Sequence, residues 1–248
     1  MRALAALFLL VALPAQAQRV VSLNLCTDQF LVLLAPDRAV ALSPLARDPA
    51  LSFVARQAAA MDWVRPDAEA VLRLKPDLVL AGPFGARTTL AALERRGIRV
   101  ERTVMPQDFA AIRAETRRFA ALLGAEAKGE ALLAEMDQML AAVPKRPPIR
   151  ALALQARGYT AYPGSLEDSV LAAAGLVDMG AGRRLGLEAI AADRPGLLVT
   201  AAAPDYPSLA TDMLLHPVLR GIPRRTWQPA LLACGGPWTA SAVAALAP

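Results

Sequence analysis

Glu69-Ala-Val-Leu-Arg-Leu-Lys-Pro-Asp-Leu-Val-Leu-Ala81 has a counterpart later in the chain, Glu188-Ala-Ile-Ala-Ala-Asp-Arg-Pro-Gly-Leu-Leu-Val-Thr200. Each copy reads as a helix, a basic residue, a proline that ends the helix and a buried strand. The offset is constant, because 188 − 69 and 195 − 76 both equal 119, about half of the 248 residues. An offset of half the chain favours an internal duplication and predicts two similar lobes.

Strands and helices alternate around the first copy. Thr27 and Asp28 are expected to cap the first helix, and Gly97 to end a later one. Strands are predicted over residues 19–25, 40–43, 78–81 and 98–102, and helices over 29–34, 67–74 and 88–96. This alternation predicts an α/β fold in which each lobe is Rossmann-like, with a parallel sheet covered by helices.

The region between the predicted lobes is helical. Residues 108–123 and 125–142 carry apolar side chains at helical spacing, and Gly124 separates the two segments. A helix over 125–142 would be about 27 Å long at about 1.5 Å per residue, enough to join two lobes rigidly. We therefore expect an N-terminal lobe over 18–124, a single connecting helix over 125–143, and a C-terminal lobe over 144–248, with a ligand cleft between the lobes.

The first residues have the pattern of an export signal. Met1-Arg2 is a short basic start, residues 3–13 are apolar and uncharged, and Pro14-Ala15-Gln16-Ala17 supplies an Ala-x-Ala cleavage motif. The apolar run is too short to cross a bilayer. We expect residues 1–17 to be a cleaved signal peptide and the mature chain, starting at Gln18, to be periplasmic.

The charge distribution and the two cysteines bear on the expected partners and on disulfide bonding. The formal net charge of +5 comes mostly from arginines scattered along the chain, so we do not expect a nucleic-acid partner. Cys26 follows the first strand and Cys234 the last. In an oxidising compartment they could form one disulfide across the lobe edges, and the alternative is two unpaired thiols.

Catalytic motifs are sparse. His216 is the single histidine, so a metal site built from several histidines is excluded and we expect neither a metal nor a cofactor. A hydrolase that uses Cys234 or Ser165 with His216 remains as an alternative. A binding protein without chemistry of its own is the favoured interpretation.

Aromatic and arginine residues follow the predicted strands, at the sheet edge where α/β proteins bind ligands. Each aromatic could equally pack in a core, but their presence in both lobes predicts a cleft for a large, flat or apolar ligand. An arginine pair in the second lobe could meet an anionic group of that ligand. The candidate ligand-binding residues are Trp63, Phe84, Arg87, Tyr159, Tyr162, Arg183, Arg184 and Trp238.

These features resemble a known family, the periplasmic binding proteins of ABC importers for iron-siderophores, haem and cobalamin. The resemblance covers the mature chain and rests on Arg19-Val-Val-Ser-Leu23, on Leu-Lys-Pro-Asp-Leu-Val within residues 69–81, and on Gly97-Ile98 before a strand. It implies two α/β lobes joined by one long helix, with the ligand held in the cleft between them. It also implies a monomer that delivers its ligand to a membrane permease.

The cobalamin-binding members of the family suggest roles for individual residues. In sequence order, Trp63 falls on a cleft tryptophan of those proteins, Phe84 and Tyr162 lie near cleft aromatics, and Trp238 lies near an arginine that contacts the ligand. Glu69 and Glu188 fall on two glutamates that dock on arginines of the permease.

Departures from the cobalamin-binding pattern affect the expected ligand. Arg183-Arg184 stands where those members have a second-lobe tryptophan, and Cys234-Gly-Gly replaces an acidic loop. The expected ligand is therefore an iron-siderophore or a corrinoid, with the arginines favouring an anionic iron chelate. Haem or another metal complex is the alternative within the family, and a sensor of the same fold is an alternative without an importer.

Overall fold

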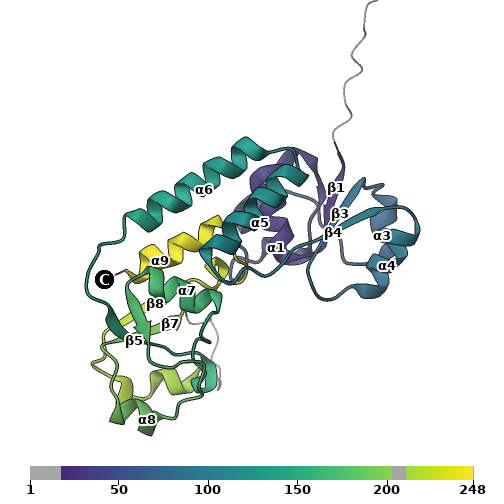
Figure 1. The fold of residues 1–248 in the computed structure, drawn as a ribbon. Helices are drawn as coiled ribbons and strands as arrows, with labels where there is room; N and C mark the ends of the chain where they lie inside the picture. The colour runs from purple at the N-terminus through teal and green to yellow at the C-terminus, as the bar shows by residue number, and fades with distance from the viewer. Residues whose placement is uncertain (1–17, 203–210, 248) are drawn as a thin grey trace, which may run out of the picture.

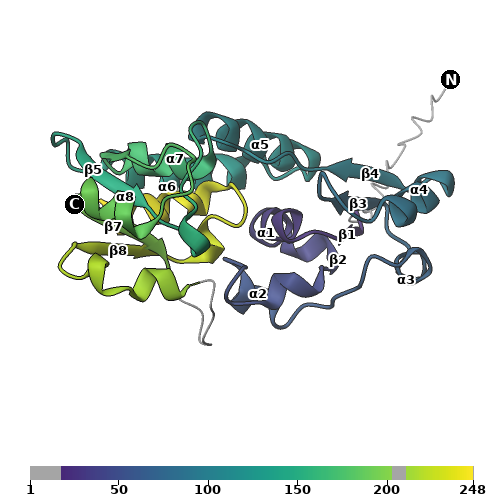
Figure 2. The same ribbon diagram turned by 90° about the horizontal axis from the view of Figure 1, so that it is seen from below.

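Two lobes of similar topology make up the protein in the computed structural model, which describes residues 18–202 and 211–247 (Figures 1 and 2). The signal peptide expected over residues 1–17 lies outside the described residues. Within the described part, no helix has both the length and the apolar character needed to cross a membrane. The N-lobe contains the first sheet, and the C-lobe contains the second.

The N-lobe is built on a four-stranded parallel sheet in the order β2-β1-β3-β4. Its central strand β3 is fully buried, as the apolar run Leu-Val-Leu-Ala predicts for a strand covered on both faces. The elements are β1 (Val20–Ser22), α1 (Leu25–Leu34), β2 (Ala39–Ala41), α2 (Ala55–Ala58), α3 (Ala68–Arg73), β3 (Leu78–Ala81), α4 (Arg87–Arg95) and β4 (Arg99–Arg102).

The C-lobe repeats this plan with a parallel sheet in the order β6-β5-β7-β8. Its elements are β5 (Ile149–Ala153), α7 (Leu166–Ala173), β6 (Leu176–Asp178), α8 (Leu187–Ala192), β7 (Leu197–Ala201) and β8 (Arg224–Trp227). Short 3₁₀ turns lie in the connections of both lobes: η1 (Pro36–Arg38), η2 (Pro44–Arg47), η3 (Ala156–Gly158), η4 (Asp212–Leu215), η5 (Pro217–Leu219), η6 (Pro229–Leu231) and η7 (Pro237–Thr239).

The internal repeat appears in the structure as equivalent elements. Helix α8 is displaced from α3 by 187 − 68 = 119 positions, and β7 begins 197 − 78 = 119 positions after β3. The strand orders of the two sheets correspond one to one, because β1, β2, β3 and β4 take the places of β5, β6, β7 and β8. The prediction of two α/β lobes with parallel sheets is confirmed.

Two long helices, α5 (Phe109–Leu122) and α6 (Glu126–Ala141), cross between the lobes and pack on each other (Figure 1). On α6, Leu132 packs against the N-lobe core, whereas Leu133 and Met136 belong to the C-lobe core. Helix α5 is shared in the same way, because Phe119 lies in the first core and Ile112 in the second. The lobes are therefore joined by two long helices, α5 and α6, whereas the sequence predicted a single connecting helix.

The chain returns to the N-lobe at its end. After β8 it passes Cys234 and Trp238, both of which pack in the N-lobe core, and then forms α9 (Ala240–Leu246) against α6. The Trp238 ring lies 5.5 Å from Phe30 and 5.8 Å from Phe53, measured between ring centroids. These contacts make the C-terminal segment part of both lobes.

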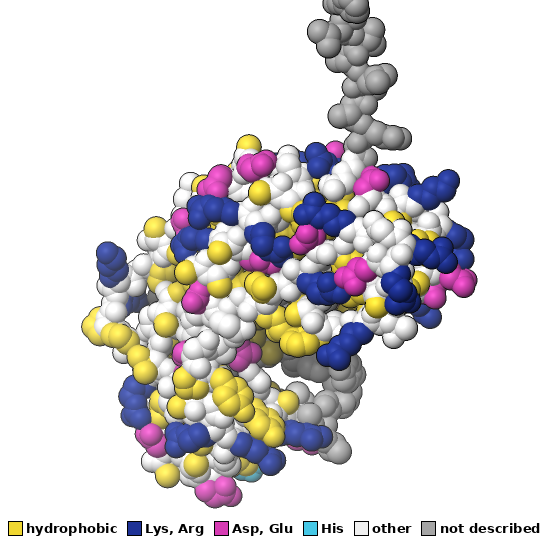
Figure 3. All heavy atoms as spheres, turned by 45° about the vertical axis from the view of Figure 1, so that its right-hand side comes forward, with side chains coloured by type: hydrophobic (Ala, Val, Ile, Leu, Met, Phe, Trp, Pro, Cys, Tyr) yellow, Lys and Arg dark blue, Asp and Glu magenta, His cyan; other side chains and the backbone are white. Residues whose placement is uncertain are grey.

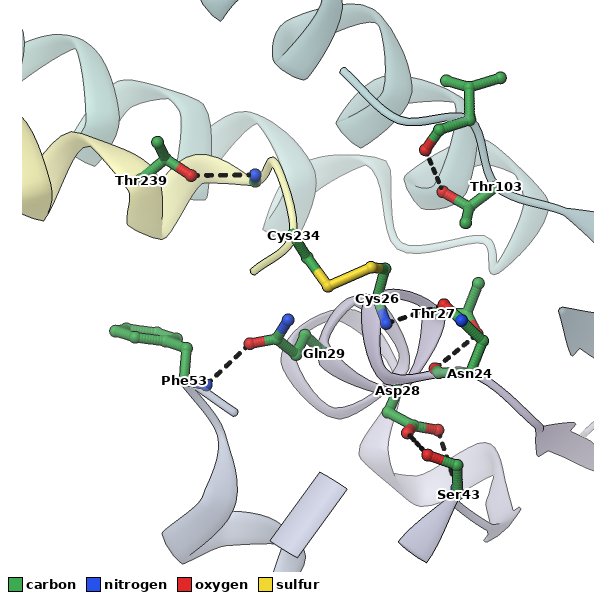
Figure 4. Close-up of a disulfide and its surroundings, with 12 residues drawn as sticks. Asn24, Cys26, Thr27, Asp28, Gln29, Ser43, Phe53, Thr103, Cys234 and Thr239 are labelled. Atoms are coloured by element: carbon green, nitrogen blue, oxygen red, sulfur yellow. Dashed lines mark hydrogen bonds between the residues drawn. A yellow bond between two sulfur atoms is a disulfide. The ribbon is translucent and has the colours of Figure 1, made fainter. Parts of the chain in front are cut away.

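Helix α1 begins earlier than the sequence predicts. Its N-cap is Asn24, whose side chain accepts a hydrogen bond from the Cys26 amide, so Thr27 and Asp28 lie inside the helix. Asp28 is buried and accepts hydrogen bonds from the amide and hydroxyl of Ser43 (Figure 4). Thr27 and Asp28 are common capping residues, but their side chains bond elsewhere here.

Candidate ligand-binding cleft

A pocket of about 170 Å³ opens between the lobes, and it is the candidate binding site. Four segments line it, and each follows the carboxyl end of a strand: Cys26 after β1, residues 103–107 after β4, residues 165–167 at the start of α7, and residues 232–235 after β8. We call this the cleft pocket. Parallel sheets bind ligands at this edge because loops from several strands converge there.

The molecule is hollowed between its lobes, and hydrophobic side chains lie along the margin of the hollow (Figure 3). Beyond the pocket itself, exposed apolar side chains follow strands of both sheets. A group of exposed apolar side chains along a cleft is typical of a binding site for a ligand or a partner.

The disulfide between Cys26 and Cys234 forms part of the pocket wall (Figure 4). Its Cα atoms are 5.3 Å apart, although the two residues are 208 positions apart in sequence. Of the two possibilities left open by the sequence, the structure has the bonded one. The bond fixes the start of α1 to the segment that leaves the C-lobe sheet.

The loop 103–107 forms another part of the pocket wall, and a buried carboxylate holds it in place. Glu115, on α5, is 4% exposed and accepts hydrogen bonds from the Thr103 hydroxyl (2.8 Å) and the Val104 amide (3.1 Å). Arg118 donates two further hydrogen bonds to the same carboxylate. Burial alone would raise the pKa of Glu115, but the hydrogen bonds from Arg118, Thr103 and Val104 outweigh it, so the pKa is lowered.

Pro106 brings this loop against the C-terminal segment. A side-chain carbon placed on Gly235 would lie only 3.0 Å from the Pro106 ring, so any larger residue would press against the loop. Val104 and Met105 remain 56% and 57% exposed at the pocket. Neither residue was predicted, because nothing in the local sequence shows that the chain after β4 turns toward the other lobe.

In the N-lobe, Trp63, Phe84 and Arg87 all lie at the carboxyl edge of the sheet. Trp63 is 47% exposed and extends the sheet through a parallel bridge to Leu42, the residue after β2. Phe84 is 76% exposed in the turn after β3, and Arg87 is the exposed first residue of α4. The two rings are available to a ligand, but the cleft pocket itself does not include them.

In the C-lobe, Tyr159 and Tyr162 follow β5 and are 44% and 62% exposed. Tyr162 lies flat over Gly182, where an added side-chain carbon would come within 2.7 Å of the ring. Gly182 also has φ of +75°, a left-handed conformation that favours glycine. The position of the Tyr162 ring therefore depends on this glycine.

The arginine pair, Arg183 and Arg184, lies beside the loop that carries Tyr159 and Tyr162, here called the tyrosine loop. Arg184 lies over the Tyr159 ring at 5.7 Å and donates to the Arg157 carbonyl, while a β-bridge joins residues 159 and 184. Arg183 turns back to donate to the carbonyls of Met179 and Gly180. Arg184 therefore presents a positive charge beside an exposed aromatic ring, whereas Arg183 mainly holds its own loop.

Glu167 contributes the one ionisable side chain among the described residues that line the pocket. It lies in the first turn of α7 and accepts a hydrogen bond from Gln155. Burial raises the pKa of its carboxyl, and the nearby Asp178 raises it further. Glu167 was missed in the sequence, where a carboxylate in a first helical turn looks like an ordinary solvated residue.

Trp238 does not lie where the sequence suggested. It is 3% exposed and packs between Phe30 and Phe53 in the N-lobe core, so the structure leaves it no ring face for a ligand. The expectation rested on its place after the last strand. The segment passes that sheet edge and continues into the first lobe, where a large apolar ring is buried instead.

The residues proposed for the hydrolase alternative are engaged in other contacts. Cys234 is bonded to Cys26, and the described chain contains no free thiol. The Ser165 hydroxyl accepts a hydrogen bond from the Asp168 amide as the N-cap of α7, and His216 Nδ1 accepts one from the Val218 amide. These hydrogen bonds are helix-capping contacts and do not join a nucleophile to a base.

Glu69 and Glu188 occupy equivalent positions in α3 and α8, each in the first turn and each exposed. The two helices lie at the outer ends of the two lobes (Figure 1). The duplication therefore places one exposed carboxylate on each lobe.

The fold and the pocket together describe a two-lobe protein with a candidate binding cleft between its lobes. Sequence comparison agrees, because a family described as Periplasmic binding protein matches residues 20–223. The chain therefore belongs to the periplasmic binding proteins. The family and its structural relatives are solute-binding proteins, not enzymes. No curated protein sequence matches the chain significantly.

Several solved structures of similar fold are described as haem-binding or vitamin B12-binding proteins. The periplasmic haem-binding protein RhuT of Roseiflexus sp. RS-1 is 25% identical with a TM-score of 0.71, over 92% of this chain and 96% of that one. A periplasmic haem-binding protein of Pseudomonas aeruginosa is 25% identical with a TM-score of 0.70, over 93% and 91%. The vitamin B12-binding protein BtuF of Vibrio cholerae shares the fold at 19% identity, with a TM-score of 0.62 over 92% and 94%.

Proposed function

We propose that this protein captures a large, flat metal complex in the periplasm and delivers it to the permease of an ABC importer. The observation that carries the proposal is the set of exposed aromatic and apolar side chains at the facing sheet edges of the two lobes, among them Trp63, Phe84 and Tyr162. Such a rim suits a ligand with extended apolar faces. Residues 1–17 would direct export and be removed as the chain crosses the membrane.

Haem is one candidate ligand. Two haem-binding proteins have similar structures at 25% identity, and the pocket walls are mostly apolar, as a porphyrin face requires. Arg184 beside Tyr159 offers a cation for a carboxylate of such a ligand. A corrinoid or an anionic ferric siderophore remains the alternative, because each is also a large metal complex but presents different groups at its edge.

The test is a spectroscopic titration of the purified mature chain with hemin, cyanocobalamin and ferric citrate. Binding of hemin in the cleft is expected to shift its Soret absorption and to quench tryptophan fluorescence, with a stoichiometry that saturates. Trp63→Ala should weaken that binding, while Leu215→Ala, at an exposed apolar residue in η4 outside the pocket lining, should not. Failure of all three compounds to bind would exclude this class of cargo.

Delivery to a permease is proposed from the two equivalent carboxylates. Glu69 and Glu188 stand on opposite lobes in related helices, and a two-fold symmetric permease could offer one arginine to each. Exposed pairs of this kind contribute about 0–1 kcal/mol each, so their main effect would be to orient the docked protein.

Uptake measured in cells tests this role. The double variant Glu69→Arg/Glu188→Arg is expected to abolish uptake without changing ligand affinity in solution. The matched control is Glu126→Arg/Glu135→Arg, which makes the same change of charge at exposed positions of α6. If both double variants transport normally, the protein does not dock through these residues, and a sensor role without an importer gains support.

A further inference from the structure

Glu167 is placed differently from the other carboxylates of the C-lobe. Its neighbours in the cleft pocket are apolar or uncharged: Val104, Met105, Leu166, Leu232 and the disulfide. In the described part of the chain it belongs to no ion pair, so no cation neutralises it. A carboxylate withdrawn from water in this way requires hydrogen-bond donors.

The described residues supply one hydrogen-bond donor to this carboxylate. Gln155 donates to Oε2 of Glu167, and no other described residue donates to the carboxylate. Oε1 therefore has no hydrogen-bond partner among the described residues, and Glu167 is part of the pocket wall. A carboxylate offers about four acceptor sites and no donor when ionised, so the unmet capacity is specific for N–H and O–H groups. The raised pKa agrees with a site that is short of donors.

We infer that Glu167 is a specificity-determining residue of the cleft: its Oε1 accepts a hydrogen bond from an amide, hydroxyl or ammonium group at the edge of the cargo. The same oxygen disfavours a cargo that places a carboxylate there. This inference rests on the proposed function, and it narrows the cargo to complexes with a donor group on the side facing α7. Arg184, beside the tyrosine loop, would take an anionic group at another position of the same ligand.

Two probe ligands distinguish a preference for hydrogen-bond donors from a preference for carboxylates at this position. Dicyanocobinamide carries primary amides around its ring, whereas hemin carries two carboxylates and no peripheral donor. Each is titrated against the wild-type chain, Glu167→Gln, Glu167→Ala and the control Glu126→Gln, which removes an exposed carboxylate on α6. The isosteric Glu167→Gln keeps the side chain's shape, so a folding defect in Glu167→Ala does not end the test.

We expect Glu167→Ala to weaken cobinamide binding about tenfold, as loss of a hydrogen bond to a charged group typically does. Glu167→Gln should give a smaller loss, and hemin affinity should stay constant or rise in both variants. The control should change neither affinity. If the ratio of the two affinities stays the same in both Glu167 variants, or if the wild type binds hemin but not cobinamide, this inference is wrong while the proposed function stands. A wild type that binds neither probe overturns both.

Discussion

Thr103 Oγ1 donates a buried hydrogen bond of 2.8 Å to Glu115 Oε1 and so ties the end of β4 to the middle of α5. The backbone amide of the next residue, Val104, donates a hydrogen bond to the same oxygen. The loop that forms one wall of the cleft pocket is thus fixed from the interior by a carboxylate that touches no ligand. Glu115 is a positioning residue.

Glu115→Gln is therefore expected to loosen this loop. A neutral amide accepts more weakly than a carboxylate and cannot satisfy Arg118 as well, so the free energy of unfolding should fall by about 1–3 kcal/mol. Hydrogen exchange at the Val104 amide measures the effect locally and should become faster. Unchanged protection of that amide would mean that the loop is held by its packing on Gly235 instead.

The buried carboxyl of Asp28 predicts a pH dependence of stability. Burial raises its pKa from 3.8 to about 7, against the opposing effect of hydrogen bonds from Ser22 and Ser43. The folded protein therefore holds a proton that the unfolded chain releases, so this group's contribution to stability is complete below about pH 4. It is lost as the pH rises to about 7 and is constant above that.

The measurement compares wild-type protein with Asp28→Asn by denaturant unfolding between pH 4 and pH 8. The difference between their unfolding free energies should shift against the wild type by on the order of 4 kcal/mol across that range. A difference that does not vary with pH would show that Asp28 keeps an ordinary pKa in the folded protein.

Trp63 and Trp238 are expected to respond oppositely to truncation. Trp63→Ala removes an exposed ring, so it should weaken ligand binding by about 1–3 kcal/mol and leave stability nearly unchanged. Trp238→Ala opens a cavity beside Phe30 and should cost about 3–5 kcal/mol of stability. Thermal unfolding and ligand titration of both variants separate the two roles, and equal effects on stability would contradict the assignment.

Gly182→Ala tests whether the Tyr162 ring must lie where it does. The new methyl group would meet the ring, and the left-handed backbone adds a cost of about 1–2 kcal/mol. Gly164→Ala is the matched control, because Gly164 has nearly the same φ, +76°, but open space around its side-chain position. Both variants should lose stability through the backbone, Gly182→Ala somewhat more because of the contact with the ring, and only Gly182→Ala should also lose ligand affinity. If both variants lost ligand affinity to the same extent, Tyr162 would not be a ligand-binding residue.

The sequence predicted the repeated architecture because strong local signals specify it. Pro76 and Pro195 each end a helix before an apolar strand, and this pattern does not depend on distant contacts. The exposed aromatics after the strands were also found at the sheet edges, since the direction of a parallel strand fixes where its following loop emerges. Whether they contact a ligand stays a prediction.

The errors concern long-range choices. Trp238 follows a C-lobe strand but packs in the N-lobe, and no local pattern says which of two lobes a returning segment joins. Asn24 caps α1 instead of Thr27 or Asp28, because Asp28 bonds to Ser43, fifteen positions away. Glu167 became a candidate only when the pocket showed which residues surround it.

Loss of the disulfide should destabilise the folded protein strongly. The bond closes a loop with a sequence separation of 208, and chain entropy assigns a loop of that size about 5 kcal/mol. Cys26→Ser/Cys234→Ser should therefore unfold at a much lower denaturant concentration, and the oxidised wild type treated with a reductant should match it. If the double variant is as stable as the oxidised protein, the bond makes no net contribution to stability.

The same bond gives the mature chain a nearly circular covalent path. Every element from α1 to η6 lies inside the ring that Cys26 and Cys234 close, and only the first strand and the last helices lie outside it. A protease that cuts a single surface loop within the ring would leave one molecule, its two fragments still linked and both lobes still in register. Ring closure must also wait for Cys234, which follows the last strand, so the bond can link the lobes only after the residues of both sheets have been synthesised.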